Sequence, residues 1–126
     1  MIKSKSEHEP YLTWFTDGQH ECLSDTTADK GGKNAGFRPH DLLEAALACC
    51  ITMTARMFAE RRGIPLRQVR TTVQLNRENA NETILEVETE FDGELSAEQL
   101  EQLKAATRAC PVRKTLSKPI RFVDPA

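Results

Sequence analysis

"PHDLLEAALACCITMTARMFAERRG", residues 39–63, is the stretch that decides the fold of this chain. Proline suits the first position of a helix, and Asp41 favours its positive end. Apolar residues then recur at helical spacing, and two arginines followed by Gly63 are typical of a helix end. From Ala45 to Ala55 every side is apolar or small, which predicts a helix whose middle is buried all round.

The composition is that of an ordinary folded protein. The 126 residues are 39% hydrophobic and 29% charged with a net charge of −2, which predicts a single domain over residues 1–126. Acidic and basic residues are interspersed, which argues against nucleic-acid or membrane binding. The N-terminus is polar and lacks the apolar core of a signal peptide, and the run 45–55 is shorter than the ~20 residues that span a bilayer. We therefore expect a cytoplasmic protein with reduced cysteines.

The segment before this helix reads as a hairpin followed by a loop. Asp17-Gly18 is typical of a two-residue turn. In that register the facing pairs are Thr16 with Gln19 and Thr13 with Cys22, and one face holds Tyr11, Phe15, His20 and Cys22. Residues 25–39, "DTTADKGGKNAGFRP", carry three glycines without hydrophobic periodicity, so we expect a loop.

The segment after the helix contains a second hairpin and two more helices. Residues 69–78 and 83–93 alternate with period two, which predicts strands with one face in water. Ser96 and Gln99 form the capping box of a helix that extends to Cys110, and Pro111 begins a further short helical turn. Residues 118–124, "KPIRFVD", read as a last edge strand.

The order of these predicted strands and helices along the chain indicates an α+β fold in which antiparallel strands wrap a central helix. A helix that is apolar on all sides needs cover on all sides, and one sheet covers only one of them. We therefore expect a second copy of the chain to cover the other side, in an intimate homodimer.

Four cysteines are candidates for chemistry or for packing. Cys50 lies on the apolar stripe of the long helix, where most cysteines are small buried hydrophobes. Cys110 precedes Pro111 at a helix start, close to basic residues, where a thiolate is stabilised; it is otherwise a packing residue. Cys22 reads as a passive strand residue. Cys49 lies about 100° round the helix from Cys50, so both thiols cannot face one pocket.

A zinc site is the weaker interpretation of these cysteines. Structural zinc requires pairs such as C-x-x-C or H-x-x-x-H, and the chain has neither. We expect neither a metal nor an organic cofactor.

Two stretches resemble one known family. Residues 38–64 resemble the central-helix signature of the OsmC/organic-hydroperoxide-resistance superfamily, in which a cysteine stands eleven positions after the proline; here that cysteine is Cys50. "ACPVRKTLSKPIRF", residues 109–122, resembles the second motif, a Cys-Pro that opens a short helix, and gives Cys110. The resemblance extends over the whole chain.

The resemblance implies an OsmC-like α+β fold, an intertwined homodimer and sites at the dimer interface. It implies that Cys50 attacks a peroxide and becomes a sulfenic acid, and that Cys110 resolves it as a disulfide. A thiol reductant, often a dihydrolipoyl protein, then reopens the bond. The implied substrates are small apolar hydroperoxides.

The chain departs from the peroxide-reducing branches of that family near the start of the helix. In those branches a glutamate follows the proline and pairs with an arginine from the N-terminal region. Here His40 takes the glutamate position, and no arginine precedes Arg38. Arg38 and Asp41 are nearby substitutes, and His40 is a candidate proton donor or thiolate partner. These three are the candidate supporting residues.

Two other functions compete with hydroperoxide reduction. A sulfur or acyl carrier would hold a persulfide on Cys110 and pass it to Cys50. A binding module would hold an apolar ligand at the dimer interface and use the cysteines only for packing. Peroxide turnover, protein-bound sulfane sulfur and tolerance of cysteine replacement distinguish the three.

Overall fold

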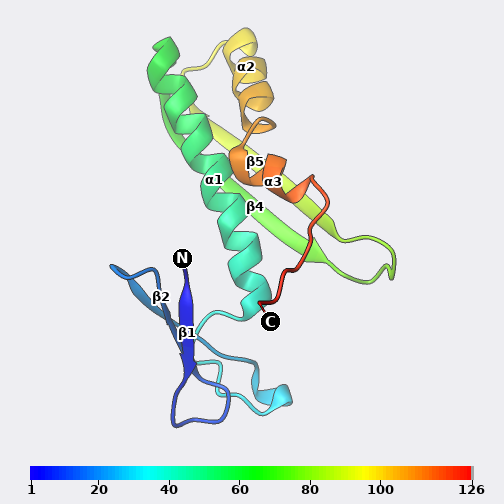
Figure 1. Cartoon of the computed structure of the whole chain (residues 1–126). Coiled ribbons are helices and arrows are strands. Elements are labelled where there is room, and N and C mark those ends of the chain that lie inside the picture. Colours follow the sequence, from blue (N-terminus) through cyan, green and yellow to red (C-terminus); the bar gives the residue numbers. More distant parts are fainter. Residues whose placement is uncertain (126) are drawn as a thin grey trace. The chain divides into compact units, whose positions relative to one another are not determined.

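The computed structural model describes residues 1–125. The chain forms two compact units, Met1–Leu43 and residues 44–125, which are described separately. The first unit holds three strands and the beginning of the long helix, and the second holds the rest of the helix, two strands and two further helices. Figure 1 shows the course of the chain through both units.

Strands β1 (Lys3–Ser6), β2 (Thr13–Thr16) and β3 (Glu21–Ser24) form an antiparallel sheet in the order β1-β2-β3. The sequence did not predict β1, because its four residues, KSKS, are polar and all exposed. They therefore lack the hydrophobic alternation that marks a strand.

The turn between β2 and β3 is wider than the sequence predicts. Thr16 pairs with Glu21 rather than Gln19, and Thr13 pairs with Ser24 rather than Cys22, so residues 17–20 form the turn. The Asp17 carboxylate accepts hydrogen bonds from the backbone N–H groups of Gln19 and His20, at 2.8 and 2.7 Å, and closes the longer loop. His20 therefore lies outside the strands.

One part of the predicted hairpin geometry is confirmed. Phe15 pairs with Cys22, so these two side chains share a face of the sheet.

The glycine-rich loop is ordered around Asp25. This carboxylate is buried and accepts hydrogen bonds from the backbone N–H groups of Thr26, Lys33 and Ala35. The loop contains one short 3₁₀ turn, Ala28–Lys30, and returns to β3 through a bridge between Ser24 and Phe37. A Cβ at Gly36 would lie 2.3 Å from the Leu23 carbonyl oxygen, so the close return of the loop requires glycine.

The long helix α1 runs over Pro39–Arg62, as predicted, and ends before Gly63, which has φ +63°. Its burial differs from the prediction. Only a stripe of four residues is buried: Leu47, Ile51, Ala55 and Ala59. Met53 is 59% exposed in this single chain, so the middle of the helix is covered on one side only.

Among residues 1–125, α1 is the one helix that is long and apolar enough to cross a membrane, with a mean hydropathy of 1.5 over its most apolar window. The uncharged run 45–55 is much shorter than α1, so the run alone underestimated the length of the apolar helix. The core helix of a soluble protein passes the same test, and the buried stripe of α1 packs in a protein core.

Strands β4 (Leu66–Asn76) and β5 (Ile84–Gly93) form an antiparallel hairpin. Val73 faces Val87 and Leu75 faces Leu85, which confirms the predicted apolar face, while the intervening glutamates are exposed. Helix α2 (Ala97–Thr107) begins at Ser96 with the predicted capping box, and α3 (Pro111–Leu116) begins after Cys110.

Two buried clusters join these elements. One combines Ala55 and Ala59 of α1 with Ile64, Leu66 and, from α2, Leu103. The other combines Leu47 and Ile51 with Cys110 and reaches both strands of the hairpin. Figure 1 shows α2 and α3 beside the β4–β5 hairpin.

The predicted last strand is wrong. Residues 119–125 form no strand, and Ile120, Phe122 and Val123 are 63%, 86% and 73% exposed. The apolar alternation of this tail is that of a strand, but a strand forms only where a second strand accepts its backbone hydrogen bonds.

Candidate active site

Two cysteines from distant parts of the sequence meet in one buried cluster. Cys50 comes from the middle of α1 and Cys110 from the residue before α3. Cys110 is 0% exposed and packs with Leu47 and Ile51, and Cys50 packs against the same cluster. All four cysteines of the chain are free thiols.

The groups around Cys50 favour its ionisation. Burial of its thiol opposes ionisation, but hydrogen bonds from the Cys110 thiol, the backbone N–H of Val112 and the Thr54 hydroxyl together lower the pKa of Cys50. All three donors are uncharged, and a thiolate at this position would accept from each of them.

Cys110 shows the opposite behaviour. Burial raises the pKa of Cys110, and the hydrogen bond to Cys50 and the charge of Cys50 raise it further. The backbone N–H groups of Arg113 and Val112 lower this pKa, but by less. The pair therefore combines a partly exposed thiol that ionises more readily with a buried thiol that keeps its proton. Thiolate is the nucleophilic form, so Cys50 is the better nucleophile.

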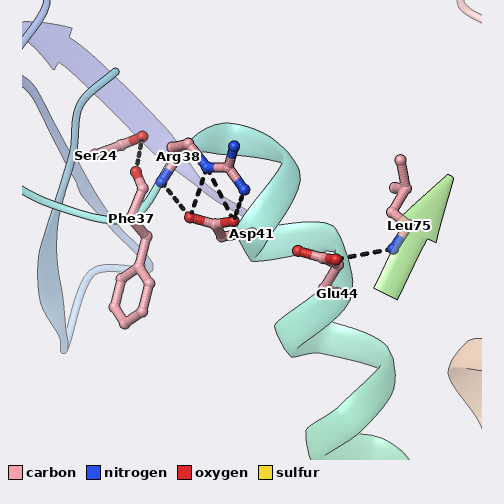
Figure 2. Close-up of polar contacts among 6 residues, drawn as sticks. All are labelled: Ser24, Phe37, Arg38, Asp41, Glu44 and Leu75. Atoms are coloured by element: carbon pink, nitrogen blue, oxygen red, sulfur yellow. Dashed lines mark hydrogen bonds and ion pairs between the residues drawn. The ribbon is translucent and has the colours of Figure 1, made fainter. Parts of the chain in front are cut away.

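Polar contacts fix α1 against the hairpin that supports this pair. The Thr52 hydroxyl donates to Thr71 of β4 at 2.9 Å, and the Glu44 carboxylate accepts from the Leu75 backbone N–H at 2.8 Å. Figure 2 shows this second contact. The Arg56 guanidinium donates to the Leu66 carbonyl oxygen at 2.6 Å. These contacts lie on both sides of Cys50 along the helix and restrict its position.

The candidate supporting residues lie at the start of α1. Arg38 and Asp41 form an ion pair of 2.7 Å, and the Asp41 carboxylate also accepts from the Arg38 backbone N–H at 2.9 Å (Figure 2). This contact is the half of a capping box in which the side chain of the third helical residue accepts from the backbone N–H of the residue before the helix. His40 is the second residue of α1 and is partly buried. The structure thus brings Arg38 and Asp41 together, and their role toward Cys50 stays a prediction.

The other two cysteines lie in different surroundings from the pair. Cys49 is exposed and Cys50 is partly buried, so the two adjacent thiols do not face one pocket, as their offset of about 100° predicts; the exposure of Cys49 differs from the predicted burial of the whole middle of the helix. Cys22 lies on β3, half-buried, with its thiol 3.8 Å from the Leu23 carbonyl oxygen. Among residues 1–125, no three His, Cys, Asp or Glu side chains converge as a metal site would require.

Sequence reasoning missed two of the groups that contact Cys50. Thr54 stands one helical turn after Cys50, and that i,i+4 spacing alone could have indicated the contact. The Val112 backbone N–H had no signal of its own, because its position depends on how the Cys110-Pro111 turn packs against α1.

Known proteins share a family profile and a fold with this chain. The sequence profile of OsmC-like proteins matches residues 31–123. No curated protein matches the sequence significantly.

Solved structures share the fold at low sequence identity. An OsmC-like protein from Mycoplasma pneumoniae superposes with a TM-score of 0.77 at 20% identity, over 92% of this chain and 85% of that one. The organic hydroperoxide resistance protein OsmC of Legionella pneumophila gives 0.66 at 22% identity, over 93% and 89%. OhrB of Bacillus subtilis, another organic hydroperoxide resistance protein, gives 0.64 at 18% identity, over 93% and 89%.

Proposed function

Because this chain belongs to the OsmC-like protein family, we propose that it reduces organic hydroperoxides with Cys50 and Cys110 as its redox pair. Some proteins that share its fold are named organic hydroperoxide resistance proteins. Their identity to this chain is 22% or less, so the proposal depends on the site itself.

One observation carries the proposal: the two cysteines pack in one buried cluster, and their surroundings shift their pKa values in opposite directions. A two-cysteine peroxidase needs one thiol that ionises and attacks, and a second thiol that stays within reach until the first is oxidised. Cys50 has the properties of the first thiol and Cys110 those of the second.

The reaction follows from these two roles. The Cys50 thiolate attacks the terminal oxygen of ROOH, so an S–O bond forms while the O–O bond breaks, and the alkoxide leaves as ROH after taking a proton. Cys50 is then a sulfenic acid. The Cys110 sulfur attacks the Cys50 sulfur, which forms the disulfide and releases water. An external dithiol reduces this disulfide through a mixed disulfide and is itself oxidised.

The proposal also includes a substrate, a reductant, a compartment and a set of supporting residues. The substrate is a small apolar hydroperoxide, and the reductant is a thiol of the dihydrolipoyl type. We place the protein in the cytoplasm, where a reductant can regenerate the thiols. Arg38, His40 and Asp41 are proposed to support the helix start that leads to Cys50.

The functional form is proposed to be a homodimer. Met53 and Met57 are 59% and 53% exposed on α1 and line a cavity of about 430 Å³ beside Val69 of β4. The apolar C-terminal tail is also uncovered. A second copy would cover these surfaces, since soluble monomers rarely expose large contiguous apolar patches.

The test is to treat reduced protein with one equivalent of cumene hydroperoxide, to follow peroxide loss and to map disulfides by mass spectrometry. Rapid loss with a Cys50–Cys110 bond is expected, and Cys50→Ser should abolish the loss. Cys49→Ser is the matched control on the neighbouring residue and should react as the unmodified protein does. Slow loss, or a bond that involves Cys49, would contradict the proposal.

A further inference from the structure

A groove lies between β5 and the helices α2 and α3. It consists of two neighbouring cavities of about 370 and 230 Å³. Leu85, Val87 and Arg113 line both cavities, which makes them one continuous groove. Neither the proposed redox chemistry nor the proposed dimer contact uses it.

The floor of the groove holds an apolar strip within a lining that is largely polar. Leu85, Val87 and Phe91 alternate along β5 and therefore point to the same face of the hairpin, together with Thr89. Val87 is 37% exposed, so part of this apolar face is open to solvent instead of being covered by the helices. Such a floor favours an aliphatic or aromatic ligand body.

The rim of the groove is basic. Lys104, Arg108 and Arg113 line its larger cavity. Lys104 pairs with Glu101 at 3.3 Å, but Arg108 and Arg113 have no carboxylate partner within the part of the chain that the structure describes. Two guanidinium groups without a counter-ion next to an apolar floor favour a ligand that brings its own negative charge.

One end of the groove adjoins the thiol pair. Leu47 and Leu85 line the smaller cavity, and both also pack in the cluster that contains Cys110. A ligand in the groove would therefore lie against the side chains that enclose the two sulfurs.

We propose that this groove binds an amphipathic organic carboxylate, with its apolar body along β5 and its carboxylate at Arg113 and Arg108. The guanidinium fork matches a carboxylate with two parallel hydrogen bonds. This inference goes beyond the proposed function, because binding requires neither thiol.

The test is calorimetric titration of the reduced full-length protein with octanoate and, separately, with octan-1-ol, which has the same chain without the charge. Octanoate should bind about tenfold more tightly, the discrimination expected of one charge-assisted contact. Arg113→Gln should remove that preference while octan-1-ol binding persists. Lys114→Gln, on the same short helix but outside the groove lining, should behave as the unmodified protein.

Three results would overturn the proposal. The first is equal affinity for the two ligands, or no detectable binding of octanoate. The second is an equal loss in Arg113→Gln and Lys114→Gln, which would indicate non-specific attraction to positive charge. The third is a change of oligomeric state in Arg113→Gln, which would mean that a second copy occupies the groove.

Two further variants keep the result interpretable. Cys50→Ser should bind octanoate normally, so a failed peroxidase assay and a failed binding assay remain separate results. If Arg113→Gln does not fold, the double variant Lys104→Gln/Arg108→Gln tests the opposite rim, and unchanged octanoate preference there would contradict a role for Arg108.

Discussion

At the scale of single residues, the two thiols differ in pKa because their surroundings differ. Cys50 accepts from uncharged donors that lower its pKa, whereas Cys110 is enclosed and keeps its proton. A chain without an arginine before position 38 can therefore still activate a thiol, because hydrogen bonds to the charged form favour ionisation as a cation does.

The first prediction concerns pH. The thiolate fraction of Cys50 rises as pH rises through its pKa, and that pKa is lowered. Its alkylation by iodoacetamide should therefore reach a plateau at a lower pH than that of an ordinary cysteine, whose pKa is about 8.5. Mass spectrometry of the peptide from α1 measures the rate. Cys110→Ala removes one donor and should move the plateau to higher pH, and an unchanged profile would show that the contact between the thiols is unimportant.

The second prediction concerns Thr54. Thr54→Val keeps the shape of the side chain but removes the hydroxyl that donates to Cys50. The pKa of Cys50 should rise, and its alkylation at pH 7 should slow by roughly tenfold if one hydrogen bond to the thiolate is lost. Thr54→Ser keeps the hydroxyl and should restore the rate. If Val and Ser variants slow equally, the role of Thr54 is packing.

At the scale of elements, the sequence predicted what local rules determine. Pro39 and Gly63 bound α1, Ser96 caps α2, and the alternation on β4 and β5 matches their apolar face. The two errors have different causes. The Asp17 carboxylate accepts from backbone N–H groups two and three residues ahead and selects a wider turn than Asp17-Gly18 alone predicts, whereas residues 119–125 find no strand to pair with.

The candidate site also has a part that the sequence predicted and a part that it did not. The resemblance to the OsmC/organic-hydroperoxide-resistance superfamily indicated both cysteines, through the spacing after Pro39 and the Cys-Pro dipeptide, because such motifs depend on local sequence. The groups that contact Cys50 were not predictable from them. The backbone N–H of Val112 reaches Cys50 only through the packing of α3 on α1, and that packing depends on tertiary structure.

The third prediction concerns the start of α2. Ser96 accepts from the Gln99 backbone N–H at 3.1 Å, and the Gln99 side chain accepts from the Ser96 N–H at 3.0 Å. Ser96→Ala should lower the free energy of unfolding by about 1 kcal/mol, because the helix loses a capping acceptor. Urea denaturation measures the change. Ser96→Asp keeps an acceptor and should recover most of it, and no loss in the alanine variant would contradict the capping role.

At the scale of the whole molecule, only one side of α1 is buried, although residues 45–55 in its middle are apolar or small on all sides. Met53 and Met57 remain exposed on it. The single chain therefore leaves unburied the surface that its composition would place in a core, and this is the physical reason for the proposed homodimer.

The fourth prediction tests that assembly. Light scattering of the unmodified protein should give the mass of two chains across a range of concentrations. Met53→Glu places a charge in the proposed interface and should shift the mass toward one chain. Glu88→Gln changes the exposed face of β5 and should leave the dimer intact. A monomer for the unmodified protein at every concentration would exclude the homodimer.

The contact between Cys50 and Cys110 also couples oxidation to conformational stability. A bond between these sulfurs would close a loop of about sixty residues, and loop-closure entropy assigns such a cross-link about 4 kcal/mol of stabilisation. By the same thermodynamic cycle, the folded chain favours formation of the bond as much as the bond favours the folded chain. A chain that has just consumed a peroxide would therefore resist unfolding more than one that awaits it, and resistance to proteolysis would report its redox history.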